Sequence, residues 1–332
     1  MNTDCLLSII VPVYNVEKYI RSCMESIFRQ NLDESIFEVI IVNDGTPDHS
    51  MEMIQDIINQ HPNISVINQE NLSLSVARNN GIAKAKGEYI LMLDSDDLLV
   101  DDSLSMLLEE TVKSKADLIV ADFLEMNDEE IDELTTIEQP PLIIMERKNE
   151  ELYMQDLNPN QCYVWRTLYR RSFLVDNNIS FVPGISCQDV PFTNECYLRS
   201  KNSLRVNILL NIYRRRLMSA TSFFNKKKCM DLCTAVAATW KLRNIKGLSD
   251  EVKLRLCDNA FVSFSLIFYV MIKGVKSCKD RREIFSCLNS QAPDLAFSHG
   301  IKQRITTFLY KLSPAFYYAF RRVLKVLAMK QT

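Results

Sequence analysis

Residues 88–97 read EYILMLDSDD, an apolar run that leads directly into Asp94, Ser95, Asp96 and Asp97. A nearly continuous apolar run is typical of a strand that is buried on both faces of a parallel sheet. The carboxylates at its end repel one another, and their removal from water is costly unless a positive charge compensates. The stretch therefore predicts a buried strand over 88–94 that ends in a site short of positive charge.

The chain on either side of this stretch alternates between two patterns. Apolar runs of the same kind predict strands at 7–13, 37–43, 64–69, 88–94 and 117–123. Apolar residues at helical spacing predict helices between them, at 16–30, 48–60, 74–86 and 102–113. This alternation indicates an α/β fold, a Rossmann-like and mostly parallel sheet with helices on both faces.

Polar residues follow three of these strands at the point where each one ends. They are Tyr14–Asn15, Asn43–Gly45 and Asp94–Asp97. In parallel α/β sheets ligands bind beyond the carboxyl ends of the strands. We therefore expect the three groups to meet on one rim of the sheet.

The rest of the chain is organised differently. Residues 127–141, NDEEIDELTTIEQPP, are expected to form an exposed loop, and strands and short helices resume at 161–216. From residue 226 onward the pattern is almost wholly helical. We predict an α/β domain over 1–222 and a helical region over 223–332.

Composition excludes several classes of protein. The 332 residues are 47% apolar and 24% charged with a net charge of −3, which is typical of a globular chain and gives no general attraction to nucleic acid. Seven glycines and no GxGxxG or GxxxxGK[ST] motif argue against a glycine-rich phosphate loop.

Location follows from the cysteines and from the absence of signals. The ten cysteines are scattered without a CxxC pair, and the first residues lack a secretory pattern, so we expect reduced thiols in a cytoplasmic protein. The apolar stretch 261–272 is too short and too polar to span a bilayer on its own.

The acidic cluster has two interpretations. Asp and Ser at a strand end can cap the following helix. Alternatively, the carboxylates bind Mg²⁺ or Mn²⁺, which take one or two carboxylates and complete their shell with water and substrate phosphate oxygens. A calcium loop of the EF-hand type is excluded, because its sixth position would be Leu99 instead of glycine.

Five stretches in order resemble family 2 glycosyltransferases of the bacterial surface-polysaccharide type, which have the GT-A fold and invert the anomeric centre. They are SIIVPVYNVEKYI (8–20), VIIVNDGTPD (39–48), SVARNNGIAKAKGEYILMLDSDD (75–97), YVWRTLYRRSFL (163–174) and FVPGISCQDVPF (181–192). The resemblance covers roughly residues 1–222. It implies transfer of a sugar from a nucleoside-diphosphate donor to a saccharide or lipid-linked saccharide, and the nucleotide usual in the family is UDP.

The resemblance also implies a donor site. Pro12, Tyr14 and Asn15 match the family segment that lines the nucleotide pocket, and Asp44 and Arg78 match residues that reach the base, ribose or diphosphate. The simpler alternatives are that Tyr14 packs on the first helix, that Asp44 belongs to an Asn-Asp-Gly turn and that Arg78 is a surface helix charge.

The family's Asp-x-Asp motif corresponds to Asp94-Ser95-Asp96. We expect Asp96 to hold Mn²⁺ or Mg²⁺ and Asp94 to face the ion or the ribose, with Ser95 beside the donor. The family often has glycines before its S-x-A-R-N motif, whereas this chain has Leu72 and Ser73, so the usual sugar preference is not carried over.

The implied catalytic base is Asp189, the aspartate of the family's Glu-Asp pair, here Gln188-Asp189. Its alternative role is to cap a following helix. Gln188 is expected near the acceptor, and Trp165 either stacks on an acceptor sugar or belongs to the core. Arg214 and Arg216 match the segment that approaches the diphosphate or acceptor, and they are followed by a loop with Ser219 and Thr221.

The last segment, 300–328, combines apolar residues at helical spacing with basic ones, and Pro314 is expected to divide it into two helices. A basic amphipathic helix can lie on an anionic membrane, so the segment predicts either peripheral membrane contact or packing on the protein or a partner. The sequence is compatible with an oligomer. The rival functions are a non-catalytic nucleotide-sugar-binding or scaffold protein and a nucleotidyltransferase.

Overall fold

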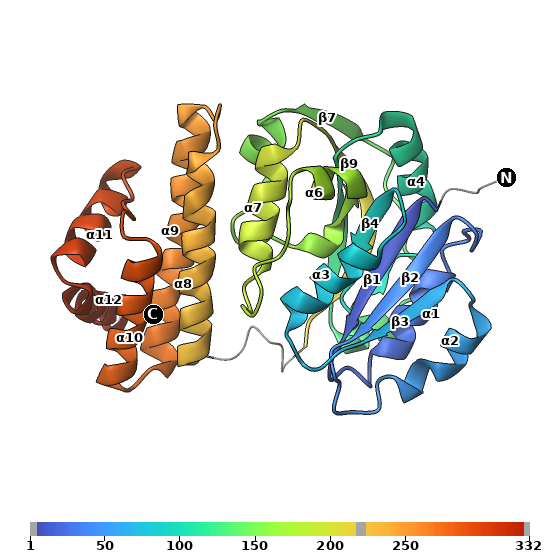
Figure 1. Ribbon diagram of the computed structural model, residues 1–332, viewed down its shortest axis with the longest axis horizontal. Coiled ribbons are helices and arrows are strands. Elements are labelled where there is room, and N and C mark those ends of the chain that lie inside the picture. The colour runs from blue at the N-terminus through green and yellow to red at the C-terminus, as the bar shows by residue number, and fades with distance from the viewer. Residues whose placement is uncertain (1–4, 217–223, 329–332) are drawn as a thin grey trace. The chain divides into compact units, whose positions relative to one another are not determined.

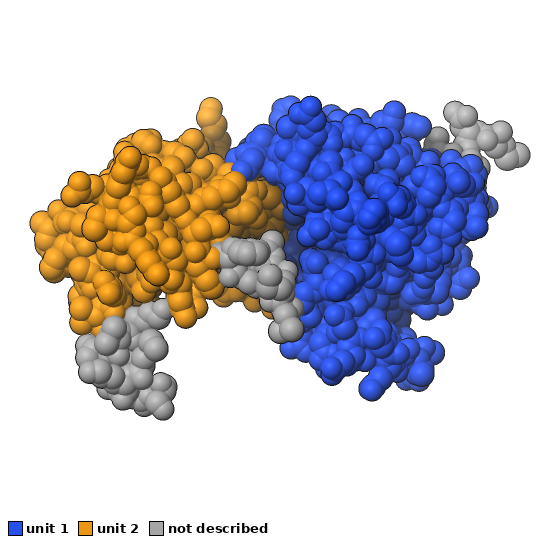
Figure 2. All heavy atoms as spheres, turned by 90° about the horizontal axis from the view of Figure 1, so that it is seen from below, with its two compact units in different colours: residues 1–157, 163–184, 196–219 blue, residues 158–162, 185–195, 220–332 orange. Residues whose placement is uncertain are grey.

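The computed structural model describes residues 5–216 and 224–328 (Figure 1). The chain forms two compact units, coloured separately in Figure 2. Unit 1 comprises residues 1–157, 163–184 and 196–219, and unit 2 comprises 158–162, 185–195 and 220–332. The boundary predicted at 222/223 lies outside the described residues, and residues 185–195 group with unit 2 although that boundary placed them in the α/β domain.

Unit 1 is built on a sheet with the strand order β3-β2-β1-β4-β8-β6-β9-β5, and β7 pairs with β9. The strands are β1 (Leu7–Val13), β2 (Phe37–Asn43), β3 (Ile64–Asn68), β4 (Tyr89–Met92), β5 (Leu98–Leu99), β6 (Leu118–Met126), β7 (Ile144–Lys148), β8 (Thr167–Arg170) and β9 (Asn202–Arg214). The five predicted strands are all present: β1 and β2 have the predicted ends, and the ends of β3, β4 and β6 are shifted by one to three residues.

The sheet is mixed, and its two halves differ. Strands β1 to β4 are parallel neighbours, as predicted. Strand β8 runs antiparallel between β4 and β6, and β5 and β7 run antiparallel to β9. Strand β6 also pairs with β9 in parallel, so the predicted mostly parallel character holds, with β5, β7 and β8 as the antiparallel strands. Parallel neighbours need a crossover such as a helix, whereas the chain reaches β8 through a long excursion that lets it return in the opposite direction.

Helices cover both faces of the sheet, which confirms that part of the prediction (Figure 1). On one face Ile9 and Val11 of β1 join a buried cluster with side chains of α1 (Ile20–Phe28) and α4 (Ser103–Ser114). On the other face Ile10 meets α3 (Leu74–Lys84) at Gly81, where an added Cβ would lie 2.4 Å from the Ile10 Cγ2. The two-residue period of the strand thus distributes its apolar residues to both layers.

The remaining helical segments of the sheet region are short. They are η1 (Glu52–Ile54), α2 (Gln55–Gln60), α5 (Asp128–Asp132), η2 (Leu152–Asp156), η3 (Val164–Arg166) and α6 (Arg171–Asp176). Helix α7 (Asp189–Arg199) begins in the segment that groups with unit 2 and ends in residues of unit 1.

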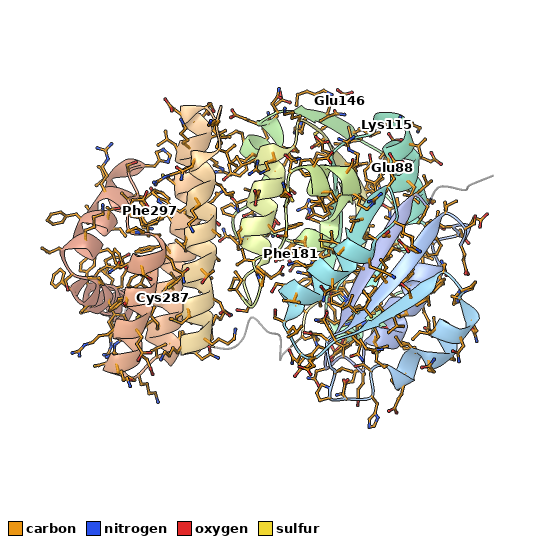
Figure 3. All side chains as sticks on the ribbon, in the orientation of Figure 1. Glu88, Lys115, Glu146, Phe181, Cys287 and Phe297 are labelled. Carbon is orange, nitrogen blue, oxygen red and sulfur yellow. The ribbon has the colours of Figure 1, made fainter. Side chains whose placement is uncertain are left out.

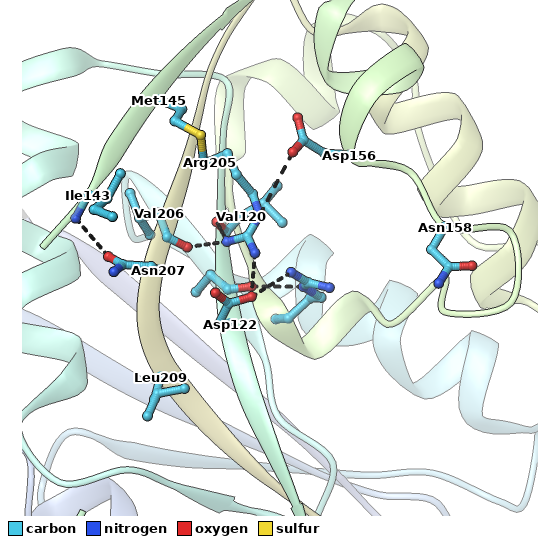
Figure 4. A network of polar contacts seen from close by, with 12 residues as sticks. Val120, Asp122, Ile143, Met145, Asp156, Asn158, Arg205, Val206, Asn207 and Leu209 are labelled. Atoms are coloured by element: carbon cyan, nitrogen blue, oxygen red, sulfur yellow. Dashed lines mark hydrogen bonds and ion pairs between the residues drawn. The ribbon is translucent and has the colours of Figure 1, made fainter. Parts of the chain in front are cut away.

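A network of charged side chains anchors the long strand β9 to β6 (Figure 4). The Arg205 guanidinium pairs with the Asp122 carboxylate, to which Arg166 also reaches at 3.4 Å. Asp156 receives a hydrogen bond of 2.6 Å from Arg147 and lies 3.9 Å from Arg205. The pairing register shifts at Asp122, so the network holds the strands together where regular pairing is interrupted.

Unit 2 is mainly helical, as predicted for the chain beyond residue 226. Its helices are α8 (Lys226–Lys241), η5 (Leu242–Asn244), α9 (Asp250–Gly274), α10 (Cys278–Gln291), α11 (Gly300–Leu312) and α12 (Pro314–Ala328). Asn225, Ser249 and Ser277 cap α8, α9 and α10 by accepting a backbone N–H three residues later. The break between α11 and α12 confirms the division predicted at Pro314.

Aromatic side chains fill the core of unit 2. The Phe264 ring lies 5.0 Å from Phe268 and 5.0 Å from Phe297, which is labelled in Figure 3. Tyr310 of α11 and Tyr317 of α12 complete the cluster at 5.2 and 6.0 Å from Phe264. Both C-terminal helices are therefore part of this core.

Helix α9 is the one helix in the described ranges that is long and apolar enough to cross a membrane by length and composition. Its most apolar window has a mean hydropathy of 1.4, and 56% of that window is buried. The stretch 261–272 was expected to be too short to span a bilayer, but the helix extends beyond that stretch at both ends. Its buried positions supply Phe264 and Phe268 to the core of unit 2.

Candidate functional site

The carboxyl ends of β1, β2 and β4 lie side by side because these strands are parallel neighbours. Val13 at the end of β1 pairs with Asn43 at the end of β2, and Ile10 pairs with Met92 at the end of β4. The chain then turns sharply after β4, where the Asp97 N–H donates to the Asp94 carbonyl at 3.0 Å. Asp94, Asp96 and Asp97 form what we call the acidic rim.

Arg78 is the counter-ion of Asp94. Its guanidinium comes from α3, is 2% exposed and pairs with the Asp94 carboxylate. It also lies 5.5 Å over the ring of Phe181, which is labelled in Figure 3. Its Nε is buried and has no hydrogen-bond partner in the described structure. Arg78 is thus a buried charge aimed at the acidic rim, and the alternative of a solvated helix charge is wrong.

Asp96 is paired with a second arginine. The Arg216 guanidinium contacts the Asp96 carboxylate and lies 5.0 Å over the ring of Tyr19. Burial, together with the negative charge of Asp94, raises the pKa of Asp96 in spite of this pairing. The positive charge that the sequence required is therefore supplied, in the free chain, by arginines from distant segments.

Arg214 contacts the rim from the end of β9 and makes several bonds. Its backbone N–H donates to the Asp97 Oδ1 at 2.9 Å, and its Nε donates to the Asp96 carbonyl at 3.0 Å. Its Nη1 donates to Asp128 at 2.5 Å, and the guanidinium lies 5.0 Å over Tyr19. Arg214 and Arg216 therefore share the Tyr19 ring, and both contact the rim.

Asp97 is the most buried member of the rim. It is fully buried, and its Oδ2 has no hydrogen-bond partner among the described residues. Burial, reinforced by the charges of Asp96 and Asp94, raises the pKa of the Asp97 carboxyl well above its usual range. A carboxylate oxygen in this position is short of a positive partner.

Asp44 organises the loop that follows β3. Its carboxylate is 4% exposed and accepts hydrogen bonds from Gln69 Nε2 at 2.7 Å, Leu72 N at 2.8 Å and Ser73 N at 3.1 Å. Ser73 has a φ of 103° and a ψ of 154°, a backbone region adopted almost only by glycine. The position where the similar family often has glycine is thus a strained serine here, held in place by Asp44.

The end of β1 and the loop after it form another side of the site. Pro12 is buried in β1, and the Tyr14 side chain is 46% exposed, so its ring is available to a ligand. Asn15 has a φ of 56°, and its N–H donates to Thr46 Oγ1 at 2.8 Å. Ser95 is 6% exposed and lies between the two rim carboxylates that precede and follow it.

A cavity of about 680 Å³ opens beside Arg216 and Tyr19, all within unit 1. Its lining comes from the loop after β1, the loop after β2, the start of α5 and the end of β9: Asn15, Val16, Glu17, Lys18, Tyr19, Asp48, Asn127, Asp128, Glu129, Arg215 and Arg216. Small-molecule sites usually occupy 300–1,000 Å³, so the cavity is large enough for a nucleotide-sized ligand.

Asp48 stabilises the wall of this cavity. Its carboxylate accepts hydrogen bonds from Thr46 Oγ1 at 2.5 Å, Ser50 Oγ at 2.6 Å and Glu17 N at 2.9 Å. Burial opposes ionisation, but the bonds from Ser50 and Thr46 outweigh it and hold the pKa of Asp48 at about 2. The loops after β1 and β2 are therefore tied together by one carboxylate.

The structure places Trp165 in the core of unit 1. It is 3% exposed, and its ring stacks on Tyr163 at 4.8 Å and on Tyr213 at 5.6 Å, with Phe123 edge-on at 4.9 Å. This position corresponds to the core alternative for Trp165.

Gln188 and Asp189 lie in the segment that groups with unit 2. Gln188 is 2% exposed and its Oε1 has no hydrogen-bond partner in the part of the chain that is described. Asp189 is the first residue of α7, where the helix dipole favours a carboxylate. It is also close enough to Cys162 and Cys187 to raise their pKa values, after the larger effect of burial. Ser219 and Thr221 lie outside the described residues.

Sequence reasoning missed Tyr19, Asp128 and Phe181, which contact the arginines of the site. Asp128 was assigned to a solvated loop, but it opens α5 and pairs with Arg214. A signal for this helix was present, because Asn127 and Glu130 have the spacing of a capping box, and both of its hydrogen bonds are formed. No local signal could have shown that the arginines use Tyr19.

No group of three or more His, Cys, Asp and Glu side chains is placed to hold a metal ion within residues 5–216 and 224–328. The rim nevertheless fits Mg²⁺ or Mn²⁺, which bind through one or two carboxylates and take the remaining oxygens from water and substrate. Asp94 and Asp96 supply two carboxylates, and the Oδ2 of Asp97 beside them is buried without a hydrogen-bond partner among the described residues.

Comparison with known proteins gives consistent results. The family model for glycosyl transferase family 2 matches residues 8–174. The uncharacterized glycosyltransferase EpsJ of Bacillus subtilis is 34% identical over 218 residues, which are 65% of this chain and 63% of EpsJ. The matched part of the chain thus spans less than two thirds of that relative's length.

Solved structures share the fold. Staphylococcus aureus TarS 1–349 in complex with UDP-GlcNAc superposes with a TM-score of 0.68 at 19% identity, over 96% of this chain and 88% of that chain. The mannosyltransferase PcManGT from Pyrobaculum calidifontis, in complex with GDP-Man and Mn²⁺, gives 0.52 at 12% identity, over 96% and 86%. These likenesses confirm the predicted α/β fold class with its helical C-terminal region.

Proposed function

We propose, because this chain belongs to glycosyltransferase family 2, that it transfers a sugar from a nucleoside diphosphate to a hydroxyl of a glycan or lipid-linked glycan in surface-polysaccharide biosynthesis. The observation that carries the proposal is the acidic rim, where Asp94 and Asp96 are each paired with an arginine guanidinium and Asp97 accepts from the backbone N–H of a third arginine. A diphosphate and its cation need this combination, since the cation binds carboxylates and the phosphates bind guanidinium groups.

The donor is proposed to be a UDP-sugar. In this proposal Pro12, Tyr14 and Asn15 line the nucleotide pocket, and the exposed ring of Tyr14 stacks on the base. Asp44 acts on the base or ribose directly and also by holding the loop at Leu72 and Ser73. The TarS structure holds UDP-GlcNAc and the PcManGT structure holds GDP-Man, which supports a nucleoside-diphosphate sugar of either base.

The diphosphate is proposed to bind where Arg78, Arg214 and Arg216 meet the rim, beside Asp94 and Ser95. Asp96, with Asp94, would hold Mn²⁺ or Mg²⁺, and the bound ion would supply positive charge that offsets the charge on the leaving diphosphate. Arg216 neutralises Asp96 in the free chain and can turn to a phosphate oxygen once Asp96 has another partner. The buried Arg78 is pre-positioned at the same place.

Asp189 is proposed as the general base. Its carboxylate takes the proton of the acceptor hydroxyl while that oxygen forms a bond to the anomeric carbon and the bond from this carbon to the diphosphate oxygen breaks. Attack from the face opposite the leaving group inverts the anomeric centre. The position of Asp189 at the start of α7 supports an ionised carboxylate. Gln188, and Trp165 if its cluster opens, are the proposed acceptor-side residues.

The proposed location is the cytoplasm, with peripheral attachment to the inner face of the membrane when the acceptor is lipid-linked. The donor reaction uses a water-soluble nucleotide sugar, so the acidic rim must face the solution in which that donor is made.

The test begins with donor binding. Thermal unfolding would be followed with UDP-GlcNAc, UDP-Glc and GDP-Man, with and without MnCl₂, because a ligand that binds the native state raises its stability. We expect Mn²⁺-dependent stabilisation by one nucleotide in the wild type and its loss in Asp96→Asn. The matched control is Asp101→Asn, an exposed carboxylate paired with Arg29 at 3.1 Å. If Asp96→Asn is stabilised by the donor and Mn²⁺ as much as the wild type is, the acidic rim does not bind them.

Turnover separates the enzyme from a non-catalytic binding protein, the alternative that Gln188 suggests. Release of nucleoside diphosphate from the stabilising donor would be measured with and without added glycan acceptors. We expect Asp189→Asn to bind donor as the wild type does but to lose about 10²–10⁴-fold in turnover, the usual contribution of a general base. Equal donor binding with no turnover in the wild type for any acceptor class would favour a binding or scaffold protein.

A further inference from the structure

Helix α11 presents its apolar side outward and its polar side inward. Ile301, Ile305, Phe308 and Leu312 are 78%, 51%, 66% and 67% exposed. At 3.6 residues per turn these four side chains fall within about 60° of one another on the helix. The side that packs on the unit instead carries Gln303, Thr306 and Tyr310, all buried. This is the reverse of the usual surface helix, in which apolar residues face the core.

Hydrogen bonds fix the inward side of α11. Gln303 Nε2 donates to Asp258 at 2.6 Å, and the Tyr310 hydroxyl donates to Asn289 at 2.7 Å. Rotation of the helix by half a turn would bury the apolar stripe, but it would break both hydrogen bonds and remove the Tyr310 ring from its contact with Phe264. The outward stripe is therefore a property of the folded unit.

Helix α12 carries a second stripe of the same kind. Phe316, Phe320, Val323 and Leu324 are exposed at positions i, i+4, i+7 and i+8. Tyr317 points inward, is 1% exposed and packs on Phe268 at 4.7 Å. Two consecutive helices thus each expose one apolar stripe while a tyrosine anchors each of them in the core. We call the eight exposed residues of α11 and α12 the apolar face.

The charged residues on α11 and α12 themselves have one sign. Lys302, Arg304 and Lys311 are exposed on α11, within about 90° of its stripe on either side, and Arg322 is exposed on α12. No acidic residue follows Asp294 in the chain. A second copy of this chain would bring the same basic belt against its own image, whereas an anionic lipid surface is complementary to both the belt and the stripe.

We propose that the apolar face of α11 and α12 binds the surface of a membrane that contains anionic lipid. The aromatic and aliphatic side chains enter the boundary between headgroups and acyl chains, and the flanking Lys and Arg side chains extend to the phosphates. Neither helix spans the bilayer in this arrangement. The proposal does not depend on the glycosyl-transfer site, which lies in other elements of the chain.

Co-sedimentation of the full chain with vesicles tests this proposal without any donor present. Phosphatidylcholine vesicles would be compared with vesicles in which about a third of the lipid is phosphatidylglycerol. We expect binding to the anionic vesicles, weakened by salt, and at least about a tenfold loss in Phe308→Asp/Phe316→Asp. The control is Val112→Asp, a 59% exposed apolar residue on α4, which should bind as the wild type does.

Two further results would overturn the proposal. Binding that is equal on neutral vesicles, or that survives the double substitution in a protein with unchanged thermal unfolding, would show that the face is not the contact. A dimer seen in sedimentation velocity and abolished by the same double substitution would assign the face to a second copy of the chain. Asp96→Asn should bind vesicles normally, so failure of the catalytic proposal and failure of this one are distinguished.

Discussion

Replacement of Asp44 tests whether one carboxylate holds the loop that shapes the donor site. Its Oδ1 accepts from Gln69 Nε2 and Leu72 N, and its Oδ2 accepts from Ser73 N. Hydrogen bonds to a charged group contribute about 1.5–3 kcal/mol each, and water can replace part of that for a loop at the surface. We therefore expect Asp44→Ala to lower the free energy of unfolding by about 3 kcal/mol. Asp44→Asn keeps the Oδ1 bonds and should lose about 1–1.5 kcal/mol.

Equilibrium unfolding in urea measures both variants, and equal m-values would show that the two unfolding transitions expose the same surface. The control is Asp101→Asn, an exposed aspartate whose side chain is 59% accessible and whose loss should change stability by less than about 0.5 kcal/mol. Two results would refute the reasoning: an alanine variant within about 1 kcal/mol of the wild type, or alanine and asparagine variants of equal stability.

Three further predictions follow from single contacts. Asp48 has a pKa of about 2 against an ordinary 3.8, so the folded chain binds fewer protons than the unfolded chain between these values. Asp48→Asn should therefore be less stable than the wild type at pH 6, and the difference should shrink as the pH falls below about 4 and vanish near 2; a constant difference in acid unfolding curves would contradict this. Gly87→Ala would place a Cβ 2.5 Å from the backbone nitrogen of Ser8, so we expect a loss of about 3 kcal/mol in urea unfolding, and a near-neutral result would show that the loop between α3 and β4 can move away from β1 there. Arg216→Ala removes the guanidinium that competes for Asp96, so calorimetry should find Mn²⁺ alone bound about fivefold more tightly, while unchanged affinity would mean that Arg216 does not guard that carboxylate.

Many of the strands and helices could be predicted from the local pattern of apolar and polar residues. The run that ends in Asp94 predicts a doubly buried strand, and β4 is buried throughout. The break at Pro314 predicts the end of α11, because proline cannot donate to the preceding turn. Such features depend on residues within one or two turns of one another, so the chain itself contains all the information needed to predict them.

The candidate site was readable only in part. The acidic rim can be predicted from the sequence, because adjacent carboxylates after an apolar run need a positively charged partner. The identity of the partners cannot be predicted in this way. Arg214 and Arg216 lie more than a hundred residues away and reach the rim only because β9 pairs with β6 and β5. Trp165 shows the same limit, because its burial depends on Tyr213 of the distant strand β9.

The sequence by itself determined five of the strands, the helices between them, the division at Pro314, and that a cluster of carboxylates follows β4. Only the tertiary structure decided which charges neutralise that cluster, that β8 enters the sheet antiparallel, and that α11 exposes its apolar side. The physical reason is that periodicity and capping are interactions between near neighbours in the chain. Strand order, ion pairing and the choice of which helix side is buried are set by contacts between distant segments, whose free energies are decided only when the whole unit packs.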